Sequence, residues 1–183
     1  MKTKDMILTA MFTALITVGA FIKIPVPVCP FTLQFFFTTL AGVLLGAKKG
    51  ALAVSVYVLL GLVGLPVFSS GGGIGYILHP TFGYLIGFVG GAYITGMIVH
   101  GGKLTMTRLF GGCFAGLFMV YSLGMAYYWA ISQFWLNDPI GIWPLFLYCF
   151  LLAVPGDICL CILSAVLGKR LLPVLQRSYK TVS

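Results

Sequence analysis

The residue of this chain with the clearest chemical potential is Asp157, in the stretch Val154-Pro155-Gly156-Asp157. Apolar residues fill positions 143–154 before it and 158–167 after it, so a membrane-spanning helix would hold its carboxylate at membrane depth. A charged Asp at the centre of a bilayer costs about 2.5–3.5 kcal/mol on insertion scales, and it is expected to face a protein interior or a wet cavity. Asp157 is therefore interpreted as a ligand-binding group. The alternative is a carboxylate paired to a neighbouring helix for structural reasons.

Uncharged polar side chains offer further candidate binding groups. Gln34, near the start of an apolar run, carries a donor and an acceptor that lipid cannot satisfy, so it should face inward in either a binding or a structural role. Thr32, two residues earlier, can instead bond its own helix. His79, just ahead of Pro80 and Thr81, is interpreted as a hydrogen-bonding pocket group or as an anchor for its loop. Tyr84, about one helical turn later, adds a ring and a hydroxyl of the kind that binding pockets use.

The polar residues of the chain give little support for a catalytic site. Tyr121 and Tyr148 lie in later apolar runs, where they either line the same cavity or join an interfacial belt of aromatic residues. The chain has no Glu, and its two histidines, His79 and His100, fall at opposite ends of one apolar run. A nucleophile-and-base set cannot be assembled from these residues, and a metal site lacks ligands. The chain is therefore not expected to be an enzyme.

A long irregular stretch, residues 66–84, contains three consecutive glycines, Gly71-Gly72-Gly73. A phosphate-binding loop would need a preceding strand and a following Lys-Ser/Thr pair, and the sequence offers neither. The stretch is rich in apolar and aromatic residues, which argues against disorder. Long loops of this kind are often functional lids, so the glycines suit a mobile gate.

The composition defines the class of protein that must position these groups. Hydrophobic residues make up 60% of the chain and charged residues 8%, with a mean hydropathy of +1.09. Soluble domains have roughly 45–50% apolar and 25% charged residues. The net charge of +8 is spread between apolar runs and not gathered on one face, which does not favour nucleic-acid binding. The sequence predicts an all-α integral membrane protein with one domain over residues 1–183.

Six spans can be drawn with the usual length of about 17–25 residues, shorter where a helix is half-embedded. A proline-spaced segment at 26–30 separates the first two spans and cannot be helical. With six spans, ten of the eleven Lys and Arg residues fall on one side and only Lys23 on the other, so both termini are expected in the cytoplasm. The predicted spans cover residues 6–22, 31–45, 51–65, 80–99, 109–131 and 143–167.

Small residues recur at intervals of four in three of these spans. This spacing allows two helix backbones to approach closely. Most motifs of this kind pack the helices of the bundle against one another. They are Ala10-x-x-x-Ala14, Gly42-x-x-x-Gly46 and Gly83-x-x-x-Gly87-x-x-x-Gly91.

Four segments of the chain form a set with a characteristic order and spacing. They are Val26-Pro27-Val28-Cys29-Pro30-Phe31-Thr32-Leu33-Gln34, Gly61-Leu62-Val63-Gly64-Leu65-Pro66-Val67-Phe68, Pro80-Thr81-Phe82-Gly83-Tyr84 and Pro155-Gly156-Asp157. Together they resemble the BioY family, the biotin-specific substrate-binding components (S-components) of energy-coupling factor (ECF) transporters. Two positions depart from the family pattern: Leu160 stands where members commonly carry Lys, and Phe82 where Gly is usual.

The resemblance implies an S-component-like bundle of six transmembrane helices in the plasma membrane that captures biotin from outside. It implies a transmembrane coupling protein (T-component) and two cytoplasmic ATPases as partners, with Ala10 and Ala14 on the coupling interface. Biotin would be the transported substrate, and no cofactor is implied. The alternatives left open are an S-component for another vitamin and a membrane channel or facilitator for a small polar solute.

Biotin would suit the candidate groups chemically. Its ureido ring offers two N–H donors and one carbonyl acceptor, which an acceptor such as Asp157 and a donor such as His79 or Gln34 would complement in a dry site. Its thiophane ring and chain suit aromatic walls. The sequence does not choose between the groups that could bind its carboxylate, which are Lys23, the hydroxyls of Ser69 and Ser70, and backbone N–H groups of the glycine loop.

Overall fold

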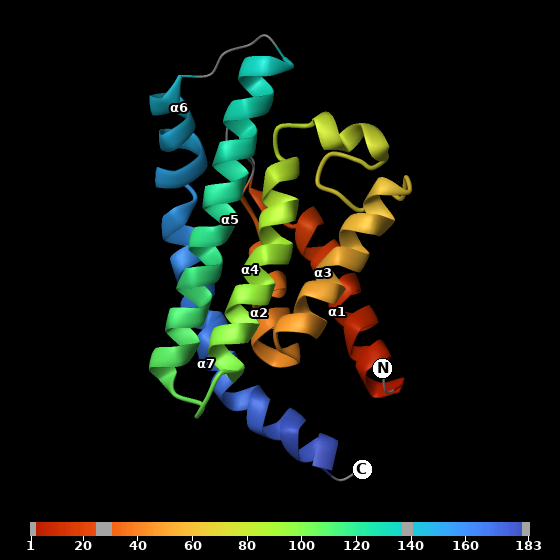
Figure 1. Ribbon diagram of the computed structural model, residues 1–183, viewed down its shortest axis with the longest axis vertical. Coiled ribbons are helices and arrows are strands. Elements are labelled where there is room, and N and C mark those ends of the chain that lie inside the picture. The colour runs from red at the N-terminus through yellow and green to blue at the C-terminus, as the bar shows by residue number, and fades with distance from the viewer. Residues whose placement is uncertain (1–2, 25–30, 137–140, 181–183) are drawn as a thin grey trace.

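The computed structural model describes residues 3–24, 31–136 and 141–180, apart from the side chains of Ile142, Tyr148 and residues 176–180. The described chain is a bundle of helices joined by short connections (Figure 1). Its elements are α1 (Thr3–Phe21), β1 (Lys23–Ile24), β2 (Phe31–Thr32), α2 (Gln34–Leu45), α3 (Ala47–Leu62), the 3-10 helix η1 (Ile74–Leu78), α4 (Phe82–His100), α5 (Met106–Phe134), α6 (Ile142–Phe146), the π-helix η2 (Leu147–Leu151) and α7 (Val154–Lys180).

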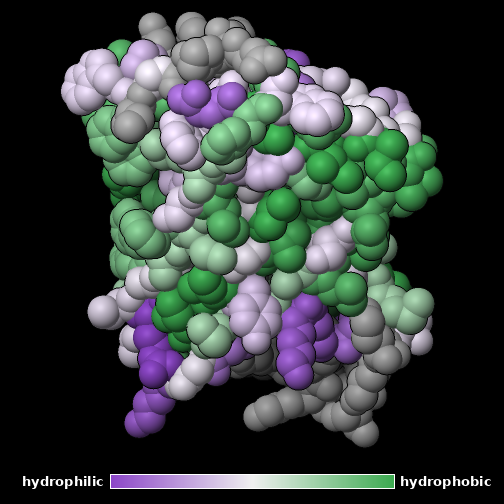
Figure 2. All heavy atoms as spheres, turned by 45° about the horizontal axis from the view of Figure 1, so that its top comes forward, coloured by the Kyte–Doolittle hydropathy of each residue, from purple (hydrophilic) through white to green (hydrophobic). Residues whose placement is uncertain are grey.

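The helices follow the six predicted spans, with α6, η2 and α7 together forming the sixth. Four of the described helical segments are long and apolar enough to cross a membrane: α1, α4, α5 and residues 143–175. The helices α2 and α3 are shorter, with 12 and 16 residues. Figure 2 shows hydrophobic residues across the middle of the molecule and strongly hydrophilic ones at its lower edge, the pattern expected of a membrane protein.

The short helix α2 lies at the centre of the bundle, where it packs against α1, α3, α4 and α7. Its residues are apolar almost throughout, and nine of its twelve are buried. A helix that is hydrophobic all round is stable only where other elements surround it. The N-terminus of α2 therefore brings Gln34 into the interior of the bundle, where Gln34 is 4% exposed.

The most extensive contact between elements joins α4 and α5, and glycine makes it possible. A Cβ atom at Gly87 would lie 2.9 Å from the Cα atom of Val120, and one at Gly91 would lie 3.0 Å from the Gly116 carbonyl oxygen. Without side chains at these positions the two backbones approach closely. The predicted Gly83, Gly87 and Gly91 motif thus packs the bundle itself.

The sixth span is interrupted, whereas the sequence predicted a continuous helix over 143–167. The π-helix η2 and a turn at Leu152 and Ala153 separate α6 from α7. Pro155 has no N–H and its ring disfavours a helix interior, but it is tolerated in a first turn. The break therefore falls ahead of Pro155, and it places Asp157 in the first turn of α7.

A two-stranded antiparallel hairpin follows α1. Its strands pair Lys23 with Thr32 and Ile24 with Phe31. The proline-spaced segment at 26–30 lies outside the described residues. Because β1 begins two residues after α1 ends and β2 ends two residues before α2 begins, the hairpin ties the ends of these two helices together.

The connection between α3 and α4, residues 63–81, is an ordered structure at the end of the bundle away from the chain termini (Figure 1). Phe68 anchors this connection and is 1% exposed. Its ring packs directly against Gly61 of α3, where a Cβ atom would lie 2.1 Å from the ring. The Gly73 N–H donates to the Gly61 carbonyl oxygen at 2.7 Å, which brings the glycine segment back onto the end of α3. Gly71 and Gly73 have φ values of 118° and 108°, which favour glycine.

A second carboxylate is also buried, at the other end of the bundle. Asp5, in the first turn of α1, is 7% exposed. Its carboxylate accepts a hydrogen bond from Lys49 Nζ at 2.6 Å, which joins the N-terminal end of α1 to the first turn of α3. Lys48 and Lys49 lie between the predicted spans 31–45 and 51–65, but only Gly46 separates α2 from α3, so both lysines belong to α3.

Candidate functional site

A cavity of about 640 Å³, counting its open mouth, lies among α2, α4, α5, α7, the β hairpin and the α3–α4 connection. Ligand pockets typically combine apolar walls with a few polar groups. This cavity has that character. Its lining residues are Phe31, Thr32, Gln34, Phe35, Ser69, Tyr76, Thr81, Tyr84, Leu85, Phe88, Val120, Tyr121, Cys149, Ala153 and Asp157.

Asp157 is the charged residue on this wall. It is 7% exposed, and one of its oxygens, Oδ2, accepts a hydrogen bond from the Tyr121 hydroxyl at 2.5 Å. Its place in the first turn of α7 also favours a negative charge, because the N-terminus of a helix carries a partial positive charge. These features stabilise the carboxylate and leave it acceptor capacity for a ligand that carries N–H groups.

Gln34 contributes the opposite hydrogen-bonding character. Its side chain lies near the Tyr57 hydroxyl, whose own proton goes to the Val67 carbonyl oxygen at 3.1 Å. The Gln34 Nε2 atom is buried and makes no hydrogen bond of normal geometry with the described residues. A buried donor without a partner costs about 1–3 kcal/mol. A ligand acceptor placed beside Gln34 would remove that penalty.

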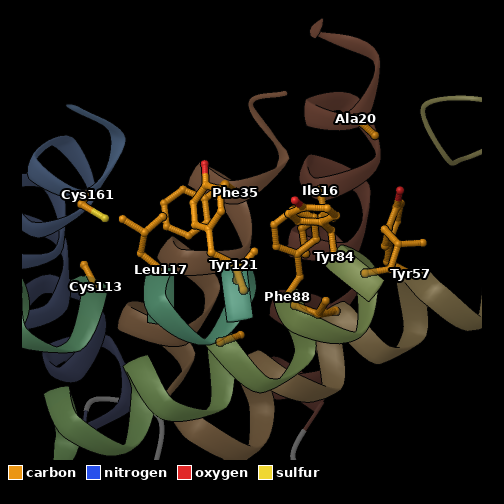
Figure 3. Close-up of a cluster of buried hydrophobic side chains, with 14 of the residues drawn as sticks. Ile16, Ala20, Phe35, Tyr57, Tyr84, Phe88, Cys113, Leu117, Tyr121 and Cys161 are labelled. Atoms are coloured by element: carbon orange, nitrogen blue, oxygen red, sulfur yellow. The ribbon is translucent and has the colours of Figure 1, made fainter. Parts of the chain in front are cut away.

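Aromatic rings from three helices form the remaining wall. In Figure 3 the rings of Phe35, Tyr84 and Tyr121 converge from α2, α4 and α5. Tyr84 and Tyr121 meet edge to face with ring centroids 6.3 Å apart, and Tyr121 meets Phe150 in the same way at 5.4 Å. This packing holds the Tyr121 hydroxyl toward Asp157 and provides apolar ring surfaces against which a ring of the ligand can pack.

Three residues of the α3–α4 connection form a hydrogen-bonded group at the edge of the cavity. The Thr81 N–H donates to His79 Nδ1 at 3.3 Å, so this nitrogen is an acceptor, and the Thr81 hydroxyl lies 2.8 Å from it. The Tyr76 hydroxyl lies 3.2 Å from the same Thr81 oxygen, and the Tyr76 ring stacks on His79 at 4.8 Å. Burial lowers the pKa of the His79 imidazole, which agrees with a neutral ring that accepts at Nδ1.

The structure brings most of the predicted site residues together. Asp157, Gln34, Tyr84, Thr32, Thr81 and Tyr121 all line the cavity. His79 does not line it, because its ring is used to hold Tyr76 and Thr81, and Ser70 is exposed beside it while Ser69 lines the wall. The side chain of Tyr148 lies outside the described ones.

Sequence reasoning missed several lining residues, among them Phe31 and Tyr76. Tyr76 is separated from Asp157 by nearly half of the chain, and its position depends on how the α3–α4 connection folds back. Phe31 had a weak signal, since it follows the proline segment directly; its ring lies against Gly156, where a Cβ would be 2.8 Å from it. Of the two positions that depart from the family pattern, Phe82 lies in the hydrophobic core and Leu160, which is partly buried, packs against it.

A cation lies at the edge of the same site. Lys23 Nζ donates a hydrogen bond to the Ser69 carbonyl oxygen at 2.9 Å. Lys23 itself is exposed. Ser69 and Thr32, which is paired with Lys23 across the hairpin, both line the cavity. The contact joins the β hairpin to the α3–α4 connection.

The small residues Ala10 and Ala14 occupy a different part of the molecule. Both are exposed on α1, whereas Phe12, Thr13 and Ile16 on the same helix are buried against the bundle. The alanine pair therefore lies on the outward face of α1 and does not pack the described helices together.

The structure combines apolar helices long enough to cross a membrane with a cavity that has aromatic walls and a few polar groups. These features are typical of membrane proteins that bind small molecules. The particular family follows from comparison with known proteins. A model of the BioY family matches residues 1–177, and the chain belongs to this family.

Named relatives and a solved structure agree with this assignment. The chain is 45% identical over 176 residues to a probable biotin transporter BioY of Lysinibacillus sphaericus, covering 96% of this chain and 90% of that protein. It is 43% identical over 136 residues to the biotin transporter BioY of Thermotoga maritima, covering 74% of this chain and 78% of that protein. The crystal structure of the S-component for biotin from an ECF-type ABC transporter matches with a TM-score of 0.69 and 29% identity, covering 93% of this chain and 91% of that one.

Proposed function

We propose that this protein is the biotin-binding S-component of an ECF-type transporter and that the cavity on Asp157 and Gln34 is its biotin site. The observation that carries the proposal is the presence, in one cavity, of an acceptor carboxylate and a buried Gln34 donor that makes no hydrogen bond of normal geometry with the described residues. The ureido ring of biotin presents donors and an acceptor side by side, so it complements this pair. Membership of the BioY family supports the same ligand.

The binding mode follows from the character of each wall. The ureido N–H groups donate to Asp157, and the ureido carbonyl oxygen accepts from Gln34 Nε2. The thiophane ring packs against the aromatic wall of Tyr84 and Tyr121, where burial of apolar area contributes about 25 cal/mol per Å². Thr32 and Thr81 supply hydroxyls near the mouth of the cavity.

The direct test is ligand binding by the purified full-length chain in detergent or nanodiscs. Isothermal titration with biotin and with a panel of other vitamins should show tight binding of biotin alone. Selective binding of another vitamin would make the chain an S-component for that compound. Passage of a small solute through liposomes that hold only this chain, with no retention of biotin, would favour a channel or facilitator instead.

We also propose that the exposed face of α1 at Ala10 and Ala14 is the surface for a transmembrane coupling protein, which works with two cytoplasmic ATPases. The chain itself is then non-catalytic, it lies in the plasma membrane, and both termini face the cytoplasm. The location of both described chain ends at the end of the bundle that carries most lysines and arginines supports this orientation. Ala10→Trp should abolish co-purification with the coupling protein while biotin affinity stays within about twofold.

A further inference from the structure

The cavity carries an acidic residue but no basic one. Eight of its fifteen lining residues are polar, and none of the fifteen is Lys, Arg or His. A ligand carboxylate enclosed there would lose its hydration without gaining a counter-ion, which is strongly unfavourable. It would also be repelled by the carboxylate of Asp157. An anionic group on the ligand must therefore lie at the edge of the cavity and find a cation there.

Lys23 is held at that edge by two independent contacts. Its backbone pairs with Thr32 across the β hairpin, and its ammonium group donates to the Ser69 carbonyl oxygen at 2.9 Å. Both of these partners line the cavity. The ammonium group is thus fixed between two segments of the cavity wall, although the Lys23 side chain remains exposed to water.

The chemistry of the ammonium group allows it to bind a ligand without leaving this position. A protonated lysine has three N–H donors and no acceptor. One donor is used on the Ser69 carbonyl oxygen, and the other two can reach a carboxylate. The Ser69 contact also holds the long side chain in one conformation in advance, which reduces the entropy lost when a ligand binds.

We propose that Lys23 binds the carboxylate of the ligand and makes the site selective for the free acid over neutral derivatives such as the amide. This inference rests on the proposed function, because it assumes that biotin occupies the cavity. With the ureido ring at Asp157, the acid tail reaches the edge formed by β1 and the α3–α4 connection. An exposed ion pair is weak, so we expect a contribution of about fivefold to tenfold in affinity.

The test compares biotin with biotinamide, which has nearly the same shape but no charge, on wild-type protein and Lys23→Gln. Glutamine can still donate to Ser69, so the hairpin keeps its contact while the charge is lost. Wild-type protein should prefer biotin to biotinamide by about fivefold to tenfold, and this preference should shrink as ionic strength rises. Lys23→Gln should bind both compounds within about twofold of each other, and its affinity for biotinamide should equal that of the wild type.

Two controls distinguish charge from structure. Lys23→Arg should keep most of the preference for the acid, and Lys103→Gln, which removes an exposed cation at the other end of α4, should leave both affinities unchanged. An equal loss for both ligands in Lys23→Gln would assign Lys23 to holding the connection and overturn the proposal, as would no change for either ligand. Absence of biotin binding by the wild type would instead refute the proposed function.

Discussion

The molecule contains two carboxylates that are buried to the same degree but serve in different settings. Asp5 and Asp157 are each 7% exposed. Asp5 accepts from the Lys49 ammonium at 2.6 Å, where α1 meets α3, whereas Asp157 accepts from the neutral Tyr121 hydroxyl at 2.5 Å on the wall of a cavity. A buried acid with a counter-charge of its own completes the structure of the protein. A buried acid whose side-chain donor among the described residues is a neutral hydroxyl, and which lines a cavity, is available to a ligand.

The difference also concerns what each acid contacts beyond its partner. Lys49 is partly exposed, so the pair with Asp5 lies at the boundary between the bundle and its surroundings. Asp157 begins a helix that was broken just ahead of it, and the aromatic packing around Tyr121 orients its partner. The position of Asp157 therefore depends on several elements of the pocket, and that of Asp5 mainly on two helix ends.

The largest expected effect is on biotin affinity when Asp157 becomes Asn. The substitution keeps the size of the side chain but replaces one acceptor with a donor that faces the ureido N–H groups. Affinity should fall about a hundredfold, or 2–3 kcal/mol, as measured by isothermal titration. Asp5→Asn is the matched control and should change affinity by less than twofold. Similar losses in the two variants would erase the distinction drawn between the acids.

The second prediction concerns the free energy of unfolding, to which we expect Asp5 to contribute although it does not contribute to biotin affinity. Asp5→Asn should reduce the free energy of unfolding by about 1–2 kcal/mol, between the values for exposed and buried ion pairs. A double-mutant cycle with Lys49→Gln should show that most of this loss is shared by the pair. Additive effects in thermal unfolding measurements would mean that the Asp5–Lys49 contact contributes little.

A third variant separates binding from stability at one residue. Gln34→Met removes the buried donor that makes no normal hydrogen bond, so the ligand-free protein should become slightly more stable. Biotin affinity should nevertheless fall by about threefold to tenfold, because the ureido carbonyl oxygen loses its partner. Thermal unfolding with and without biotin measures both effects. A loss of stability in the ligand-free protein would show that Gln34 has a structural role.

The smallest expected effect is a pH dependence of stability from His79, which extends the comparison to a titratable group whose pKa is shifted by burial alone. Burial lowers its pKa below the ordinary value of about 6.5, so the unfolded chain takes up a proton first as pH falls. Its contribution to stability is complete above about pH 6.5 and is lost as pH falls toward the lowered value. His79→Gln should remove this part of the slope in thermal unfolding against pH, and an unchanged slope would contradict the assignment to His79.

Much of the fold could be predicted because the signals are local. Runs of apolar residues define the spans, and an isolated Asp157 within such a run indicates an inward-facing group whatever its neighbours are. The glycine spacing in α4 likewise predicted a close helix contact, and α5 provides it. Gln34 was predicted to face inward for the same reason, since lipid cannot satisfy an amide group.

The remaining features depend on contacts between residues far apart in the sequence. The Asp5–Lys49 pair spans 44 residues and the Lys23–Ser69 contact spans 46, and neither leaves a local pattern. His79 was assigned to the pocket, but its ring is used to orient Tyr76 and Thr81. That outcome depends on how the α3–α4 connection folds, which in turn depends on Phe68 filling the space beside Gly61. The break before α7, by contrast, has a local cause. Pro155 disfavours a helix interior, and its position is known from the sequence.

The short distance along the chain between α1 and the β hairpin has a mechanical consequence. Nineteen residues of helix form a rigid arm about 28 Å long, and Lys23 follows its end after a single intervening residue. A body that seats against the alanine face and tilts this arm must also displace the strand bonded to Thr32 and the ammonium group at Ser69. In that case α1 would act as a lever, and by thermodynamic reciprocity an occupied site would resist the tilt by the same free energy with which the tilt weakens ligand binding.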